Sequence, residues 1–154
     1  MSPPPKLVGC TCFALRKVSR VVTRLYDQHL AAAGLRTTQY SLLRWVASAP
    51  MPIAALAAKT NTERTTLTRN LKPLIDAGWV TVRPGDDDAR QRIVSITAAG
   101  RRTIDVASAA WRTAQSELER TLGSSAVRAL HDQLDATLVR IQPLLDRTAD
   151  ELQD

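Results

Sequence analysis

Hydroxyl and cationic side chains alternate with leucines along residues 62–77, a pattern that suits contact with DNA. In an α-helix, which turns by about 100° per residue, three leucines gather on one side: Leu67, Leu71 and Leu74. The side chains that point away from them or flank them, and are candidates for DNA contact, are Arg64, Thr65, Thr66, Thr68, Arg69 and Lys72. Arginine pairs with the guanine edge through two hydrogen bonds, and threonine contacts bases or phosphates. A solvated amphipathic helix has the same pattern, so this segment alone leaves both interpretations open.

A second group of cations lies on a predicted β-hairpin. Alternating apolar and polar side chains predict two strands, over residues 79–83 and 92–97. A turn-rich tip, residues 84–88, separates them. The candidates for DNA contact here are Arg90 and Arg92, because an arginine on a narrow projecting loop can enter the minor groove. We expect the Asp88 carboxylate to orient Arg90 through a charge-assisted hydrogen bond.

The charge of the chain agrees with a polyanionic partner. The 154 residues carry a formal net charge of +6, and residues 59–102 hold nine Lys or Arg against five Asp or Glu. A basic chain favours nucleic acid or an anionic membrane surface, although charge also serves solubility. The sequence contains no apolar run of the roughly 18 residues that a membrane span needs. Composition therefore favours nucleic acid.

Two cysteines, Cys10 and Cys12, stand so close together that they cannot staple a fold of this length. This usage is typical of a reducing compartment and not of a secreted disulfide framework. Residues 7–10 match a lipoprotein cleavage box, but the apolar region of a signal peptide is missing before them. We therefore expect a cytoplasmic protein. Two thiols are too few for a metal site, His29 and His131 add no ligand spacing, and no cofactor is predicted.

Helices are predicted on both sides of the hairpin, because apolar residues recur at three- and four-residue steps. The predicted helices are 12–33, one from Thr37 or Thr38 to a break at 49–52, 53–59, 62–77, 98–122, and one after 123–125 that Pro143 bends or ends. Gly34 and Gly78 should end helices, and Thr97 should cap the start of the fifth. Pro73 should kink the fourth helix, since it removes a backbone hydrogen bond.

This order of elements predicts the fold class. A short helix, a tight turn, a second helix and a hairpin make a winged helix-turn-helix, in which the second helix enters the major groove. The chain is thus mainly α with a small β-hairpin wing, and long helices precede and follow the winged part.

Several segments, in their order and spacing, resemble the MarR (multiple antibiotic resistance regulator) family of transcription regulators. Asp88-Ala89-Arg90, followed by a strand that leads into Thr97-Ala98-Ala99-Gly100, resembles the family's wing signature. Residues 34–40 resemble the entry to its second helix, and residues 62–70 with 74–80 resemble its recognition helix and exit. The resemblance spans about residues 12–140. It implies a DNA-binding regulator, more often a repressor, that is not an enzyme.

The resemblance also implies a homodimer that straddles a pseudo-palindromic operator in double-stranded DNA. The implied regions are a flexible tail over 1–11, a helical dimerisation region over 12–34 and 98–145, a winged helix-turn-helix region over 35–97 and an acidic tail over 146–154. Apolar stripes on the last two helices agree independently, because these helices are too long to be covered by a small winged domain. An intramolecular helical pair is the alternative.

Members of this family respond to signals, and many bind small anionic aromatic molecules. The residues expected near such an effector pocket are Arg16, Arg20, Tyr26, His29, Trp45 and Trp111. Arg16 and Arg20 lie one helical turn apart and are placed to clamp the carboxylate of an aromatic acid or its thioester. Alternatively, these two arginines face solvent or an acidic neighbour.

One branch of the family senses organic hydroperoxides, and the segment around Cys12 partly resembles its thiol segment. Tyr26 stands where that branch has a tyrosine partner, but Arg16 and Thr37 replace two other tyrosines. Losing the hydroxyl donors weakens thiolate stabilisation, while a nearby arginine supports it. The redox alternative therefore uses Cys12, with Cys10 beside it. A small buried thiol that packs on the helix stripe is the competing interpretation.

Two further classes of protein compete with the DNA-binding regulator. A thiol peroxidase would use Cys12 as its nucleophile, but neither histidine lies near it in the sequence to act as a base. A winged-helix module for protein interaction would bind DNA weakly and with little dependence on salt. The gathering of threonine, arginine and lysine on one surface argues against such a module.

Overall fold

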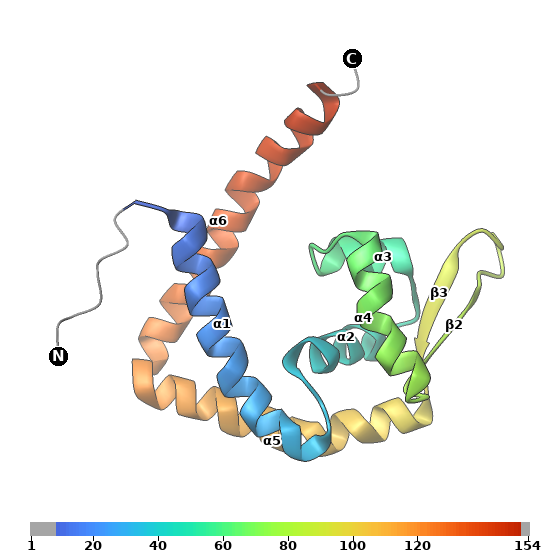
Figure 1. The fold of residues 1–154 in the computed structure, drawn as a ribbon, viewed down its shortest axis with the longest axis horizontal. Coiled ribbons are helices and arrows are strands. Elements are labelled where there is room, and N and C mark those ends of the chain that lie inside the picture. The colour runs from blue at the N-terminus through green and yellow to red at the C-terminus, as the bar shows by residue number, and fades with distance from the viewer. Residues whose placement is uncertain (1–8, 152–154) are drawn as a thin grey trace. The chain divides into compact units, whose positions relative to one another are not determined.

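The structure is a computed structural model that describes residues 9–151, with side chains described as far as Leu145. Its elements follow the predicted order (Figure 1). Their bounds are α1 Thr11–Leu30, the 3₁₀ turn η1 Ala31–Ala33, α2 Thr37–Ser48, β1 Met51–Pro52, α3 Ile53–Lys59, α4 Arg64–Asp76, β2 Val80–Pro84, β3 Arg92–Ile96, α5 Ala98–Leu122 and α6 Ser124–Glu151. The chain divides into two compact units, with the boundary between Ala114 and Gln115. Mainly α structure with a small β wing is confirmed.

The short helix and the long helix of the predicted pair are α3 and α4. A tight turn joins them, in which the Thr62 amide donates to the Ala57 carbonyl and Asn61 takes a left-handed φ of 48°. Glu63 is extended, so α4 begins at Arg64 and not at residue 62 as predicted. The helix continues through Pro73 to Asp76. Figure 1 shows α3 and α4 beside each other, with the β2–β3 hairpin next to them.

The hairpin belongs to a three-stranded antiparallel sheet in the order β1-β3-β2. Strand β1 was predicted only as a break in the chain. It pairs through Met51 with Val94 and through Pro52 with Ile93. A strand of two residues, of which the second is Pro52, carries no alternation, so sequence periodicity could not reveal it. The core beneath the sheet is made of fully buried side chains from five elements, α2, α3, α4, β2 and β3: Leu43, Val46, Leu56, Leu67, Leu71, Leu74, Val80 and Val94.

The junction between the hairpin and α5 is held by Thr97 and Gly100. The Thr97 hydroxyl donates to the Gly78 carbonyl at 2.7 Å and accepts from the Gly100 amide at 3.0 Å, so the predicted cap of α5 is confirmed. Gly100 is buried against the start of β2, and a Cβ at this position would collide with the Trp79 carbonyl oxygen. This close approach explains why the wing signature contains a glycine here.

A carboxylate on α1 fixes the start of α2. Asp27 accepts hydrogen bonds from the Thr37 amide at 2.7 Å and from the Thr37 hydroxyl at 2.6 Å. Arg36 is the N-cap, and its amide donates to the Gln39 side chain at 2.9 Å. The prediction that Thr37 or Thr38 caps α2 was therefore wrong by one or two positions, because Thr37 bonds a distant carboxylate instead of its own helix. Gly34 ends the preceding turn with a φ of 70°, as predicted.

The second unit consists of the end of α5 and the whole of α6. Gly123, with a φ of 87°, separates the two helices. Pro143 was predicted to bend or end α6. It does not end the helix, which runs through Pro143 to Glu151. Part of the expected acidic tail is therefore helical, while 152–154 lie outside the described residues. Of the expected N-terminal tail, 1–8 lie outside them and Thr11 already belongs to α1.

Candidate nucleic-acid interface

Helix α4 separates a core side from an outer side, as the helical pattern predicts. Its three leucines are fully buried, and all six of its predicted DNA-contact residues are exposed. Five of these six, together with Ile75 and Asp76, line one shallow concave surface on the helix. We call the polar part of this surface the outer face of α4, and its members are Arg64, Thr65, Thr68, Arg69, Lys72 and Asp76. Thr66 is exposed beside it.

The cations of the outer face differ in their partners. Among the described residues, Arg64 and Arg69 make no side-chain hydrogen bond or ion pair, so their guanidinium groups are available to a ligand. Lys72 is engaged, because its Nζ lies 2.9 and 3.2 Å from the two carboxylate oxygens of Asp76. The Thr68 hydroxyl donates to the Arg64 carbonyl at 2.9 Å and keeps its lone pairs for a donor. Sequence reasoning missed Asp76, although its four-residue distance from Lys72 was a usable signal.

The wing tip presents Arg90 on a compact turn. The Gly85 amide donates to the Gln91 carbonyl, and the Gln91 amide donates to the Asp88 carbonyl, both at 3.0 Å. Asp88 does orient residue 90, but its carboxylate accepts from the Arg90 backbone amide at 2.9 Å. The predicted bond to the guanidinium was therefore wrong. The short aspartate side chain readily accepts from the backbone amide two residues further along the chain. The long, flexible arginine side chain is a less favourable partner for it than this amide.

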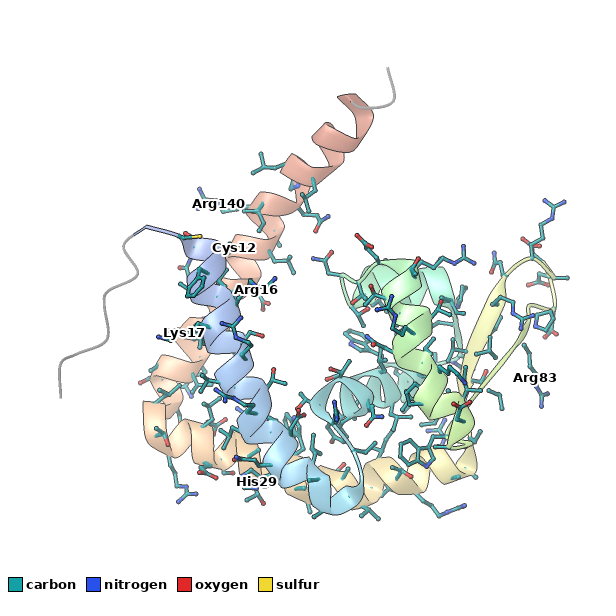
Figure 2. The ribbon with its side chains drawn as sticks, viewed as in Figure 1. Cys12, Arg16, Lys17, His29, Arg83 and Arg140 are labelled. Atoms are coloured by element: carbon teal, nitrogen blue, oxygen red, sulfur yellow. The ribbon has the colours of Figure 1, made fainter. Side chains whose placement is uncertain are left out.

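Two further arginines lie on the strands of the wing. Arg92 is exposed at the start of β3, opposite Pro84. Arg83 is exposed near the end of β2, opposite Ile93, and Figure 2 shows its side chain projecting from the hairpin. Sequence reasoning placed Arg83 in a strand but did not include it among the candidates. The alternation that predicts the strand also gives one polar face, and this was the missed signal.

The six residues expected near an effector pocket do not lie together. Trp45 and Trp111 line one groove of about 400 Å³, whose remaining lining residues are Tyr40, Ser41, Arg44 and Ser48. We call this the aromatic groove. Arg16 and Arg20 are exposed on α1, Tyr26 is buried and His29 is half-buried, and none of these four lines it. Figure 2 shows Arg16 and His29 at different levels of α1.

The aromatic groove combines stacked rings with cations. The rings of Tyr40 and Trp111 have centroids 6.3 Å apart at an interplanar angle of 28°. Arg44 lies 6.0 Å from the centre of the Tyr40 ring and donates to the Tyr40 hydroxyl at 3.4 Å. Lys59 Nζ lies 5.3 Å from the centre of the Trp45 ring. Sequence reasoning treated Tyr40 only as an apolar position of its helix and overlooked Arg44, which lies one turn further along.

Both cysteines are exposed at the start of α1. Cys10 is the N-cap residue, and Cys12 lies in the first turn, four residues before Arg16 (Figure 2). Neither thiol is buried within the single chain, so packing inside one chain does not account for Cys12. Within the described residues, no three His, Cys, Asp or Glu side chains gather as a metal site would require. No helix in the same part of the chain has the length and apolar character to cross a membrane.

A projecting β-hairpin beside a helix with an exposed cationic face defines a winged helix-turn-helix protein that binds DNA. Comparison with known proteins identifies the family of winged helix-turn-helix proteins to which the chain belongs. A model of the MarR family matches residues 33–91. An HTH-type transcriptional regulator of Bacillus subtilis, YwoH, is 30% identical over 84 residues, which are 54% of this chain and 61% of that relative.

Solved structures match over a larger share of the chain. The transcriptional regulator MosR of Mycobacterium tuberculosis, solved in complex with DNA, is 33% identical with a TM-score of 0.74, and the match covers 85% of this chain and 98% of MosR. A mutant MarR of Escherichia coli in complex with operator DNA has the same fold at 23% identity and a TM-score of 0.74, over 81% of this chain and 91% of MarR. The chain belongs to the MarR family. It is a DNA-binding transcription regulator and not an enzyme, as the sequence predicts.

Proposed function

We propose that this protein is a homodimeric repressor that binds a pseudo-palindromic operator and is released by a small aromatic acid or a similar anion. The single observation that carries the DNA-binding part is the outer face of α4, which combines exposed threonines with arginines that have no partner among the described residues. The proposed DNA-contact residues are Arg64, Thr65, Thr66, Thr68, Arg69, Arg90 and Arg92; Lys72, predicted with them, lies on the same face with its ammonium group paired to Asp76. The protein acts in the cytoplasm.

These residues divide into two roles. Arg69 lies near the middle of the outer face, so we assign it to a base edge in the major groove, where arginine discriminates guanine. Arg90 stands on the narrow wing tip with its backbone held by Asp88, so we assign it to the minor groove, where negative potential is focused. Residues 35–97 form the DNA-binding region in this arrangement.

Exposed apolar side chains on α1 and α6 support the homodimer. On α1, Phe13, Leu15, Val18 and Val21 are all exposed, and Val18 retains 54% of its surface. On α6, the exposed apolar residues follow helical spacing: Leu130, Leu134, Leu138 and Ile141. Contiguous apolar surface on a water-exposed helix marks an interface. A second copy of the chain would cover these stripes, which makes 12–34 and 98–145 the dimerisation region.

The aromatic groove supports the proposed effector class. Its rings would stack on a planar aromatic ligand, and Arg44, exposed at its edge, would pair with a carboxylate. The volume of about 400 Å³ falls within the range of small-molecule sites. Arg16, Arg20, Tyr26 and His29 lie outside this groove, so Trp45 and Trp111 are the members of the predicted set that we retain.

The proposed function is tested by measuring the affinity of the purified protein for its own upstream DNA and for an unrelated duplex. We expect preference for the upstream DNA, and we expect a series of hydroxybenzoates and hydroxycinnamates to weaken this binding. An Arg44→Gln variant should keep DNA affinity and lose the response to acids. Equal binding of both duplexes would reject an operator upstream of this gene, and no release by any acid at about millimolar concentration would reject the effector class.

A thiol switch is a second candidate, favoured by the exposure of Cys10 and Cys12 at the start of α1. Here an organic hydroperoxide would oxidise the Cys12 thiolate to a sulfenic acid, release the corresponding alcohol and weaken DNA binding. The test is DNA affinity before and after treatment with cumene hydroperoxide, in the wild type and in Cys12→Ser. Loss of binding in the wild type alone would support the switch. Equal affinity before and after would leave Cys12 without a sensing role.

A further inference from the structure

Asp76 is the only acidic side chain of α4, and it lies on the face that the helix offers to DNA. By helical rotation, it stands on the same side as Thr65 and Arg69 and opposite the three buried leucines. Its two carboxylate oxygens lie 2.9 and 3.2 Å from Lys72 Nζ. Both side chains are open to solvent, with 75% of Lys72 and 60% of Asp76 exposed. A negative charge therefore stands where phosphates of DNA would approach.

The stability of the helix does not explain this aspartate. Asp76 is the last residue of α4, where the partial negative charge of the helix end disfavours an anion. The pair also runs in the weaker order, with the cation before the anion in the sequence. An exposed pair of this kind contributes little to folding. The effect of Asp76 is therefore to be sought in the charge of the outer face.

We propose that Asp76 holds Lys72 away from the DNA backbone and thereby limits the affinity of this protein for DNA of any sequence. The inference rests on the proposed use of the outer face of α4. A phosphate and the Asp76 carboxylate are alternative anionic partners for one ammonium group. If Lys72 moved to a phosphate, it would leave Asp76 unpaired against a polyanion, so Lys72 stays with Asp76 in the complex.

This arrangement separates affinity from sequence preference. A lysine contact to phosphate adds binding energy that is nearly the same on every sequence, because phosphates carry no sequence information. Holding Lys72 on Asp76 removes that contribution. Recognition then depends on groups without an intramolecular partner among the described residues, of which Arg69 is the most central. A limited affinity for DNA also allows the binding of an effector to dissociate the protein–DNA complex.

The test is the salt dependence of DNA binding by the full chain and its Asp76→Asn variant. The probes are the upstream DNA of the gene and a mixed-sequence duplex of about three helical turns, which spans two half-sites. Freeing Lys72 adds one phosphate contact in each subunit of the dimer, so the slope of log K against log salt should steepen by about 1.8 on both duplexes. At physiological salt, the affinity of the dimer should rise about ten- to a hundredfold. Asp105→Asn, at an exposed acid on α5, makes the same change in net charge and should leave the slope unaltered.

Lys72→Ala in both backgrounds identifies the cation responsible. We expect this substitution to leave the slope of the wild type unchanged and to reverse the gain in Asp76→Asn. A wild-type slope that becomes shallower by about 1.8 in Lys72→Ala would show that Lys72 already contacts phosphate in both subunits, and would overturn the proposal. An Asp76→Asn slope equal to that of the wild type would also overturn it. Failure of the wild type to bind either duplex would instead refute the proposed DNA-binding surface itself.

Discussion

Replacing Gly100 by alanine should destabilise this protein, although alanine is the better helix former. Gly100 lies in the first turn of α5, buried under the start of β2. An added Cβ would collide with the Trp79 carbonyl oxygen and lie 2.8 Å from Ile96 Cγ1. The carbonyl cannot simply move away, because it accepts a hydrogen bond of 2.9 Å from the Thr97 amide. Relief of the clash therefore requires the hairpin and α5 to separate.

The magnitude follows from two opposing effects. Alanine in place of glycine favours a helix by about 1 kcal/mol. Overpacking costs about 1–3 kcal/mol, and the upper end applies when the obstructing atom belongs to the backbone. The net loss in free energy of unfolding should be about 2 kcal/mol, which corresponds to about 4–8 °C in Tm for a chain of this length.

Urea unfolding, followed by circular dichroism at one protein concentration, measures the effect. Ala109→Gly, at an exposed position on the same helix, is the matched control and should lose about 1 kcal/mol through helix propensity alone. We expect stability to fall when a methyl group is added at position 100 and also when one is removed at position 109. This pair of results separates the steric contact at Gly100 from the effect of helix propensity. If Gly100→Ala unfolds at the same or a higher urea concentration than the wild type, the close approach of α5 to β2 is not what restricts this position.

Three further substitutions test other parts of the argument. Thr37→Val removes the hydroxyl that donates to Asp27 and should cost about 1–2 kcal/mol in urea unfolding, whereas Thr38→Val at the exposed neighbouring position should cost little. Arg90→Ala should weaken binding to all duplexes and make the salt slope shallower by about 2, because the dimer loses two arginines, and an unchanged slope would remove Arg90 from the interface. Arg69→Ala should cost about 1–3 kcal/mol on the preferred operator and relax its preference for one base, and retained preference would exclude a base contact.

Local patterns in the sequence were sufficient to predict most of the fold. The bounds of α3 and α5 follow directly from an alanine-rich segment and from Thr97, because propensity and capping are properties of neighbouring residues. Errors arose where a distant group decides the local structure. Strand β1 exists only because β3 lies beside it, and Thr37 bonds Asp27, ten residues earlier, instead of capping α2.

The candidate site divides in the same way. The outer face of α4 was predictable because rotation along a single helix places its residues together. The aromatic groove was not, because it brings α2 to α5 across 68 residues of sequence, from Tyr40 to Ser108. Its two tryptophans were predicted, but the cations that accompany them were expected on α1. Arg44 was overlooked because an exposed arginine on an amphipathic helix carries no signal of what lies beside it.

The position of the aromatic groove relates the proposed effector to the DNA-binding surface. Tyr40 stacks on Trp111 and its hydroxyl lies 3.2 Å from Ser108 Oγ, so the outer side of α2 rests on α5. The opposite side of α2 packs against α4 through the common core. A ligand between Tyr40, Trp45 and Trp111 would therefore bear on the helix that supports the outer face of α4. The change in DNA affinity that this ligand can cause is limited by the difference in its own affinity for two positions of α2. Tyr40→Phe keeps the ring and removes the hydroxyl contact to Ser108. This variant should thus change the release of DNA by aromatic acids more than it changes DNA affinity in the absence of acid. An equal change in both quantities would show that Tyr40 only stabilises the fold.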